Sequence, residues 1–324
     1  MLSIVGGLIQ AMNKNGGRIT GLWYASGAFW LLLAMPAPTL ADEQDVKMVV
    51  TAAVVSENGI GVYEDIADYV GERLGRGARV ISGVSYDEAN MLLGQGILQV
   101  GFICGLPYTR EHARGNVHLV ATPVIATSKS GFADASGFNG APGKYFSFTI
   151  VRKDSSLNTW AELKGKTYAY SDRDSNSGYN VPRYKLIQLG VRSWEEYFSH
   201  MEHSGSHEES IRLVSRGQVD ASSVNSLVLQ YMRFRGDADA LNVRVIDANP
   251  REGAGAPPVV VSSQVEPGLR DRLQQIMVSM HKDPQGKAIL ERALLQRFIP
   301  ADDADYDGIR AMDETARRVG FEDL

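Results

Sequence analysis

Short apolar runs alternate with segments of helical periodicity along most of this chain. Strands are predicted where β-branched and aromatic residues follow one another between turn residues. These runs cover residues 46–55, 78–82, 98–104, 117–124, 145–151, 167–170, 218–223, 243–246 and 259–263. The run over residues 98–104 is apolar enough to be buried on both faces, which is typical of a strand in a parallel sheet.

Helices are predicted between these strands, where apolar residues recur every three or four positions or where capping residues mark an end. They cover residues 63–74, 85–93, 159–163, 206–216, 226–233, 269–282, 286–298 and 306–319. One more helix is expected to start near Ser175 and to end near Gly190. The alternation of strands and helices predicts an α/β fold with largely parallel sheets.

Two stretches rich in glycine and proline divide this pattern. They are Asn139-Gly-Ala-Pro-Gly143 and Gly253-Ala-Gly-Ala-Pro-Pro258. We expect the chain to leave a first lobe at one and to return to it at the other. This predicts a discontinuous first lobe (residues 42–144 and 255–324) and a second lobe (residues 145–254). Hinged lobes that close on a solute are a known binding architecture, so a ligand cleft is expected between them.

The first 41 residues have the layout of a secretory signal peptide. Lys14 and Arg18 precede an apolar stretch over residues 19–35, and small residues lead to Ala41. A basic start, an apolar middle and a small-residue end are the three parts of such a leader. An uncleaved membrane anchor is the alternative interpretation, on grounds of length.

Composition narrows the possible partners. The formal net charge of −5 argues against nucleic acid and against an anionic membrane surface. Cys104 is the only cysteine, so no intrachain disulfide can form and stability must come from a large hydrophobic core.

The segment from Tyr170 to Leu186 carries the strongest chemical signal. It is predicted to contain a strand end, a polar loop and the start of a helix, with Ser175, Ser177 and Gly178 at that start. The first N–H groups of a helix lack internal partners and the dipole there is positive, so hydroxyls and a glycine at this point predict a receptor for a small oxyanion. The alternative is that these serines only cap the helix.

Other candidate ligand-binding residues lie near predicted strand ends, helix starts and lobe crossings. They are Tyr108, Ser147, Tyr179, Ser206, His207 and Asn225. A ligand in an open parallel sheet lies beyond the carboxyl ends of the strands, which is where Tyr108 and Asn225 are expected. Core packing is the alternative for Tyr108. Ser206 and Glu209 have the spacing of a capping box, so Ser206 is as well explained by capping alone.

The sequence contains none of the common catalytic motifs that we considered. The sequence has no Gly-x-Ser-x-Gly, His-Glu-x-x-His, Cys-x-x-Cys or P-loop pattern. Adjacent Ser206 and His207 leave a hydrolase as an alternative, but no acid partner or oxyanion hole accompanies them. We therefore expect neither catalysis nor a cofactor.

Several motifs, in their order and spacing, resemble the phosphate, phosphite and phosphonate branch of the periplasmic solute-binding proteins. They are Val100-Gly-Phe-Ile-Cys-Gly-Leu-Pro-Tyr108, Lys144-Tyr-Phe-Ser147, Leu163-Lys-Gly-Lys166, Ser175-Asn-Ser-Gly-Tyr-Asn180, Ser204-Gly-Ser-His207 and Gly217-Gln-Val-Asp-Ala221. The resemblance implies a two-lobed type II fold, a periplasmic location and a monomer that holds an oxyanion between its lobes. It also implies a membrane partner, either the permease of an ABC importer or a sensor such as a histidine kinase.

Cys104 departs from what a phosphate site requires. A buried, inert thiol is one interpretation, because free cysteine is often buried. The alternative is a soft ligand for arsenic, because thiols bind metalloid centres. Some proteins that this chain resembles are arsenite-binding sensors that use one cysteine and act with a histidine kinase. Cys104 is a metal-site candidate only in that case.

Overall fold

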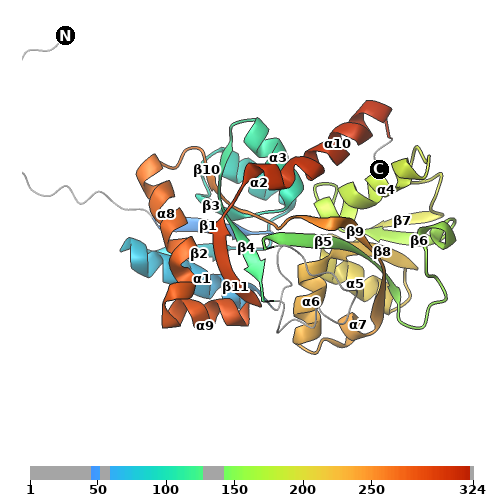
Figure 1. Ribbon diagram of the computed structural model, residues 1–324, viewed down its shortest axis with the longest axis horizontal. Coiled ribbons are helices and arrows are strands. Elements are labelled where there is room, and N and C mark those ends of the chain that lie inside the picture. The colour runs from blue at the N-terminus through green and yellow to red at the C-terminus, as the bar shows by residue number, and fades with distance from the viewer. Residues whose placement is uncertain (1–44, 52–58, 127–141, 322–324) are drawn as a thin grey trace, which may run out of the picture. The chain divides into compact units, whose positions relative to one another are not determined.

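A computed structural model describes residues 45–51, 59–126 and 142–321, and Figure 1 shows their arrangement. The predicted signal peptide lies outside the described residues. Among the described residues, no helix combines the length and the apolar character that crossing a membrane would need.

Two mixed sheets form the framework. The first has six strands in the order β11-β4-β10-β3-β1-β2, and the second has five in the order β7-β6-β8-β5-β9. The strands of the first sheet are β1 (Val46–Val50), β2 (Ala78–Ile81), β3 (Val100–Phe102), β4 (Val117–Ile125), β10 (Val259–Ser262) and β11 (Leu295–Pro300). Those of the second are β5 (Lys144–Arg152), β6 (Thr167–Tyr170), β7 (His200–His203), β8 (Ala221–Asn225) and β9 (Val243–Gly255).

The expectation of largely parallel sheets needs a correction. In the first sheet β1 pairs in parallel with β2 and β3, but β10 lies antiparallel between β3 and β4, and β11 is antiparallel to β4. In the second sheet β6 pairs in parallel with β7 and β8, whereas β5 is antiparallel to both β8 and β9. The chain enters the second sheet at β5 and re-enters the first sheet at β10. Each of these strands starts at the end of the sheet where its neighbouring strands finish, so it runs antiparallel to them.

Helices cover both sheets. Those of the first sheet are α1 (Ile60–Leu74), α2 (Tyr86–Gly94), α3 (Gly105–Ala113), α8 (Pro267–Ser279) and α9 (Pro284–Arg292). Those of the second are α4 (Val181–Gln188), α5 (His207–Ser215), α6 (Ser226–Phe234) and α7 (Ala238–Leu241). Short helical turns are η2 (Trp160–Leu163), η3 (Asn176–Asn180), η4 (Met280–Lys282) and η5 (Asp303–Tyr306). We call each sheet with its helices the first and the second lobe.

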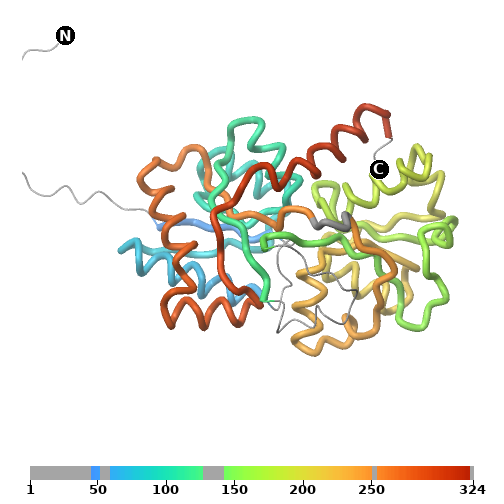
Figure 2. Tube along the Cα trace, viewed as in Figure 1, coloured from blue at the N-terminus to red at the C-terminus, as the bar shows by residue number. Residues whose placement is uncertain are grey.

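Each lobe has its own apolar core. In the first lobe, α1 buries Ile66 and Val70 against strand residues such as Met48. In the second lobe, one face of the sheet packs on α5 and α6, and the other carries an aromatic cluster around Trp194 and Tyr168. Figure 2 shows how the sequence is shared: the chain from β1 to β4, in blue to green, lies with β10, α8, α9 and β11, in orange to red, in one lobe, and the chain from β5 to β9 forms the other.

The C-terminal helix α10 (Asp307–Val319) belongs to neither lobe alone. It follows β11 of the first sheet and contacts both α3 and α4. Its buried Asp313 pairs with Arg183 of α4 at 2.7 Å, and Phe321 packs edge-on against Trp194 of the second lobe. The division of the chain into two lobes at residues 144/145 and 254/255 remains a prediction. It assigns α10 to the first lobe and does not anticipate the contacts of this helix with the second lobe.

Several segments differ from the predicted elements, and β7 and α7 were not predicted at all. A single helix was predicted over residues 286–298, but α9 ends at Arg292 and Leu295–Pro300 forms the edge strand β11. Leu294 has a φ of 57°, a left-handed conformation that ends the helix and redirects the chain. Gly105–Tyr108, which lie outside the predicted elements, form the first turn of α3.

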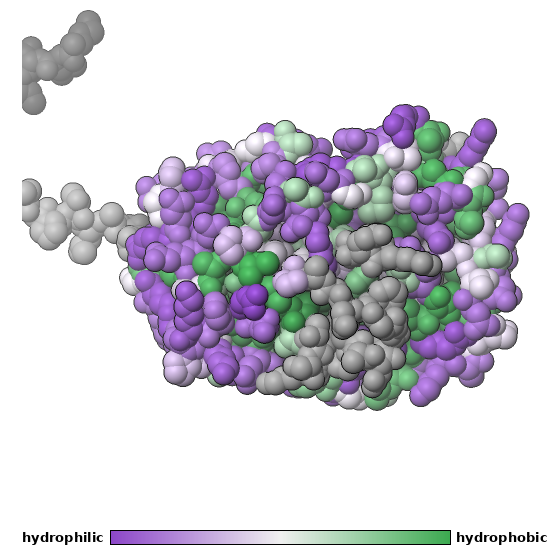
Figure 3. All heavy atoms as spheres, in the orientation of Figure 1, coloured by the Kyte–Doolittle hydropathy of each residue, from purple (hydrophilic) through white to green (hydrophobic). Residues whose placement is uncertain are grey.

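Hydrophilic residues predominate on the face drawn in Figure 3, with smaller hydrophobic areas between them. The most exposed large apolar side chains include Met91, Phe234 and Val319, which lie on different helices. Scattered apolar residues of this kind are normal on a folded surface.

Candidate functional site

Polar groups from both lobes meet in a buried cluster where strands end and helices begin. We call it the junction cluster. Its members are Cys104, Ser147, Ser175, Ser177, Gly178, His207 and Asn225, all named from the sequence and all buried. Cys104 comes from the first lobe, and the others come from the second. The structure therefore brings together most of the predicted ligand-binding residues.

The start of η3 forms the centre of the junction cluster. Ser175 is its N-cap residue, and its hydroxyl accepts a hydrogen bond from the N–H of Gly178 at 3.0 Å. The next N–H, that of Asn176, donates to the sulfur of Cys104 at 3.1 Å and so joins the two lobes. Ser147 of β5 donates to the carbonyl of Ser177 at 2.6 Å. The π-helical turn thus has its first N–H groups and hydroxyls held between strands of one lobe and α3 of the other.

His207 determines which hydrogens the serines can offer. Burial lowers the pKa of this imidazole to about 3, so it is neutral at physiological pH. Its Nδ1 accepts the backbone N–H of Asn225 at 3.3 Å, so the ring proton is on Nε2. Nε2 lies 3.3 Å from the hydroxyl oxygens of both Ser175 and Ser177.

The hydroxyl of Ser175 is consequently arranged as a donor. Its oxygen accepts from the Gly178 N–H and from the His207 imidazole, which occupies both lone pairs. Its own hydrogen therefore points to a third group, and the Tyr86 hydroxyl lies close to it. The Ser177 oxygen shares the same Nε2–H as a second acceptor, so both hydroxyls at this helix start can act as donors to an oxyanion.

Gly178 allows this close packing. A Cβ at that position would overlap the Ser171 hydroxyl and come within 3.1 Å of the His207 ring carbon Cε1. Any side chain would therefore displace groups that line the junction cluster.

Three predicted residues lie elsewhere. Tyr108 donates its hydroxyl hydrogen to Asp303 at 2.5 Å and packs edge-on against Tyr306, because the helical course of α3 directs it into the core and not toward the cluster. Tyr179 packs against Tyr170 and Trp194 in the aromatic cluster. Ser206 caps α5, where its hydroxyl accepts the N–H of Glu209 at 3.0 Å.

Cys104 is held as a neutral thiol. It is the N-cap residue of α3, is 1% exposed, and burial raises its pKa to about 11. Among the described residues, no group of three or more His, Cys, Asp or Glu side chains is arranged to hold a metal ion.

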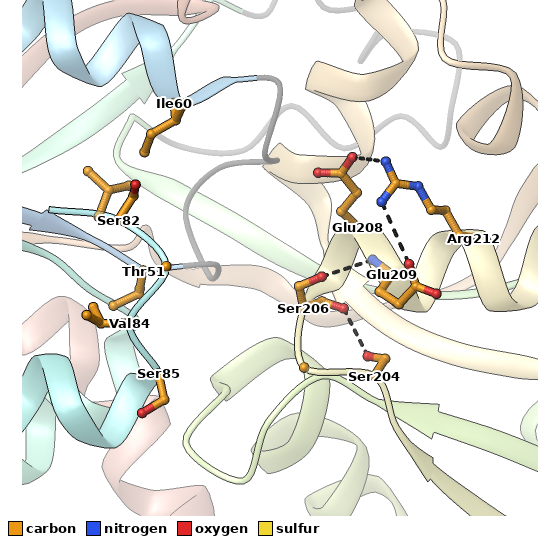
Figure 4. A pocket seen from close by; sticks show the side chains of 13 residues that line it. Thr51, Ile60, Ser82, Val84, Ser85, Ser204, Ser206, Glu208, Glu209 and Arg212 are labelled. Atoms are coloured by element: carbon orange, nitrogen blue, oxygen red, sulfur yellow. Dashed lines mark hydrogen bonds and ion pairs between the residues drawn. The ribbon is translucent and has the colours of Figure 1, made fainter. Parts of the chain in front are cut away.

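A pocket of about 670 Å³ opens next to the cluster, between the lobes. Figure 4 shows Thr51, Ile60 and Val84 of the first lobe facing Ser206 and Glu208 of the second across it. Its other described lining residues are Val50, Ser82, Gly83, Ser85, Ser204, Gly205, Glu209 and Arg212. The first-lobe wall is partly apolar, whereas the second-lobe wall consists of hydroxyls and the ion-paired Glu208–Arg212 couple.

The sequence did not single out a second polar contact between the lobes. Arg110 of α3 pairs with Asp174, in the loop before η3, at 2.5 Å and with Asp313 of α10 at 2.9 Å. Burial raises the pKa of Asp174 to about 6, while Arg110 opposes the shift and Asp172 and nearby carboxylates add to it. Tyr86 and Ser171, which were also not singled out from the sequence, are buried next to Ser175 and Gly178 of this loop.

Comparison with known proteins places this geometry in context. A family model described as the periplasmic substrate-binding protein of phosphonate ABC transporters matches residues 48–306. The chain is 28% identical over 185 residues to the phosphonates-binding periplasmic protein of Escherichia coli K12. This match covers 56% of this chain and 53% of that protein. It is 23% identical over 185 residues to a probable ABC transporter phosphite-binding protein, PhnD1, of Prochlorococcus marinus MIT 9301. This match covers 54% of this chain and 62% of that protein. The matches thus span little more than half the length of these relatives.

Solved structures show the same architecture. A binding protein component of an ABC phosphonate transporter from Pseudomonas aeruginosa has a TM-score of 0.74 at 18% identity, over 85% of this chain and 87% of that one. PhnD1 of P. marinus in complex with methylphosphonate has a TM-score of 0.71 at 19% identity, over 84% and 98%. At such identities the likeness concerns the fold alone, and it confirms the predicted two-lobed type II architecture.

Proposed function

The chain belongs to the family of periplasmic substrate-binding proteins of phosphonate ABC transporters, and on this premise we propose that it captures a small phosphorus oxyanion between its lobes. The ligand class is phosphonate, phosphite or phosphate, and the partner is the permease of an ABC importer. Delivery to the periplasm would use the leader at residues 1–41.

The observation that carries this proposal is the arrangement of Ser175 and Ser177 around His207. The neutral imidazole donates to their oxygens, so each hydroxyl can act as a donor to a ligand. Helix N-terminal N–H groups and hydroxyls bind oxyanions without a permanent positive charge. A ligand held in this way can be released when the lobes part.

The adjacent pocket supports an organic substituent on the ligand. Val50, Ile60 and Val84 line its first-lobe side, and its volume of about 670 Å³ exceeds what an inorganic phosphate needs. This favours phosphonates over phosphate.

Binding assays on the purified protein test the proposal. Thermal unfolding and calorimetric titration are measured with methylphosphonate, phosphite, phosphate and sulfate. A ligand present at 100 times its dissociation constant should stabilise the protein by about 2.7 kcal/mol. Ser177→Ala should weaken binding at least tenfold, whereas Ser279→Ala, at the C-terminal end of α8, should not change it. Absence of stabilisation by all three phosphorus oxyanions would refute the proposal.

Cys104 favours a second candidate, an arsenite-binding sensor that signals to a histidine kinase. Its sulfur lies in the junction cluster, 3.1 Å from the Asn176 nitrogen, where an oxyanion site has no need of a thiol. Thiols bind soft metalloid centres, and arsenous acid is mostly uncharged at neutral pH.

Cys104→Ser separates the two candidates. Stabilisation by arsenite that disappears in the variant supports sensing. Stabilisation by a phosphorus oxyanion that persists in the variant, with no response of the parent protein to arsenite, eliminates the second candidate.

A further inference from the structure

We propose that a proton regulates the proposed ligand site: closing the lobes on a ligand protonates a group of carboxylates beside that site, so mildly acidic solution tightens binding. We call Asp87, Asp172 and Asp174 the acidic cluster. This inference rests on the proposed function and adds a regulatory proton to it.

The acidic cluster lines a second pocket between the lobes, of about 540 Å³. Asp87 lies in the first turn of α2 in the first lobe, whereas Asp172 and Asp174 lie in the loop between β6 and η3 of the second. Ser85, drawn on the first-lobe wall in Figure 4, lines both this pocket and the one of about 670 Å³. The acidic cluster thus adjoins the proposed ligand site, and Asp174 directly precedes Ser175.

The first lobe buries the Asp174 carboxylate. Its Oδ1 accepts from Arg110 of α3 at 2.5 Å, and its Oδ2 lies 3.5 Å from the amide nitrogen of Asn90 in α2. The side chain keeps 18% exposure. Because both partners belong to the first lobe, separation of the lobes removes them and returns the carboxylate to water. The free energy of its ionisation therefore depends on whether the lobes are closed.

Negative charges face Asp174 from three elements. Asp172 lies in the same loop, and its Oδ1 accepts the backbone N–H of Asp174 at 2.7 Å. Asp87 of α2 and Glu111 of α3 add their charges from the first lobe. Burial and these like charges all disfavour the ionised form of Asp174.

The positive charge that opposes this effect is shared. Arg110 pairs with Asp174 and also with Asp313 of α10, at 2.9 Å. Burial is the larger effect, so the pKa of Asp174 is raised to about 6, and the pKa of Asp172 is raised as well. The other basic residues that line the pocket are Arg173, Arg183 and His203.

Closure therefore increases the affinity of Asp174 for a proton. In the open protein its carboxyl is in water and has the ordinary pKa of 3.8, whereas in the closed protein the pKa is about 6. A proton is taken up on closure between these values, and the closed state gains stability as the pH falls through 6. Because the ligand is held between closed lobes, its affinity should rise about tenfold from pH 7 to pH 5.

Calorimetric titration with methylphosphonate at pH 5 to 7 tests this in the parent protein and in Asp174→Asn. The amide resembles the protonated carboxyl, so the variant should lack the contribution of this proton. Titration of the ligand and of His203 affects both proteins alike. The ratio of the dissociation constant of the parent protein to that of the variant should therefore rise about tenfold from pH 5 to pH 7.

Two more variants and a second readout sharpen the test. Asp87→Asn removes one repelling charge and should move the pH dependence of the affinity to lower pH. Asp271→Asn, on α8, changes a carboxylate with 73% exposure and should reproduce the profile of the parent protein. Titrations in buffers of different ionisation enthalpy count the protons: at pH 5 the parent protein should take up about one more proton per ligand than Asp174→Asn does.

The outcomes distinguish the regulatory proton from the function on which it rests. Parallel pH profiles and equal proton uptake in the parent protein and Asp174→Asn would overturn the regulatory proton while the function stands. Weaker binding of Asp174→Asn by the same factor at every pH would also overturn it, because the side chain would then have a structural role alone. If the parent protein binds no phosphorus oxyanion at any of these pH values, the proposed function fails and the regulatory proton fails with it.

Discussion

At the scale of single residues, His207 explains why the junction cluster acts as a set of donors. Its neutral ring accepts one backbone N–H and directs its own proton to two serines. The spacing of Ser175, Ser177 and Gly178 could be recognised from sequence because hydroxyls at a helix start are a local pattern. The buried positions of Tyr86 and Ser171 near η3 could not, because they depend on the completed fold.

Gly178 gives a first prediction. In Gly178→Ala the new Cβ would overlap the Ser171 hydroxyl and crowd His207, so we expect a loss of about 1–3 kcal/mol in the free energy of unfolding and much weaker ligand binding. Urea unfolding and calorimetry measure the two effects. Gly308→Ala in α10 is the control, since a Cβ there meets nothing within 4 Å. Equal behaviour of the two variants would contradict the close packing described at Gly178.

Cys104 gives a second prediction. Because its thiol is buried, has a pKa of about 11 and contacts Asn176 of the other lobe, alkylation by iodoacetamide at pH 8 should be slow in the native protein. The reaction should proceed only when the lobes separate, and a bound ligand should slow it further. Mass spectrometry follows it without ambiguity because the chain has a single cysteine. Rapid labelling that is indifferent to ligand would show that the contact does not persist in solution.

At the scale of elements, the strands and helices with clear periodicity were predicted, and the errors have physical causes. The apolar residues after Arg292 suit either a helix or a strand. Only the pairing of this segment with β4 makes it the strand β11. Gly105 and Pro107 resemble a turn in isolation, but proline is tolerated in the first turn of a helix, where α3 places it. The antiparallel course of β5 and β10 reflects chain connections that no local pattern reports.

The helix α10 gives a third prediction. Its Asp313 and the Arg183 of α4 are each 2% exposed at the side chain, and breaking a buried ion pair from one side leaves the partner charge poorly compensated. We expect Asp313→Ala to lower the free energy of unfolding by about 3 kcal/mol, measured by urea denaturation at pH 7. Asp271→Ala removes a carboxylate with 73% exposure and should cost less than about 1 kcal/mol. Similar costs for both variants would mean that the Asp313 contacts contribute little.

At the scale of the whole molecule, the lobes are joined by two kinds of polar contact. One is the junction cluster, where the ligand is proposed to bind. The other is the Arg110 network, in which Asp174 and Asp313 accept from one guanidinium. Asp174 lies just before Ser175, so the network and the proposed ligand site share one loop of the second lobe.

Asp174 gives a fourth prediction, on pH. Its pKa is raised from 3.8 to about 6, so the folded protein binds this proton more tightly than the unfolded chain does. Stability from this group is therefore greatest below about pH 4 and declines as the pH rises through 6, by at most about 1.4 kcal/mol per pH unit. The pKa of Asp313 is shifted the other way, so its contribution is lost only at more acidic pH.

Asp174→Asn should remove this slope, because the amide resembles the protonated carboxyl. Melting temperatures at several pH values between 4 and 7 measure it. The variant should gain stability relative to the parent as the pH rises from 5 to 7. Parallel curves for the two proteins would mean that Asp174 does not take up a proton in this range.

The attachment of α10 to both lobes has a consequence for kinetics. For the lobes to part, this helix must release its contacts with either α3 or α4, and the free energy of those contacts enters the barrier to opening. Within one binding protein, changes in affinity arise mostly through the dissociation rate. Weakening the C-terminal helix far from the pocket should therefore shorten the residence time of a captured molecule while its rate of capture stays nearly the same.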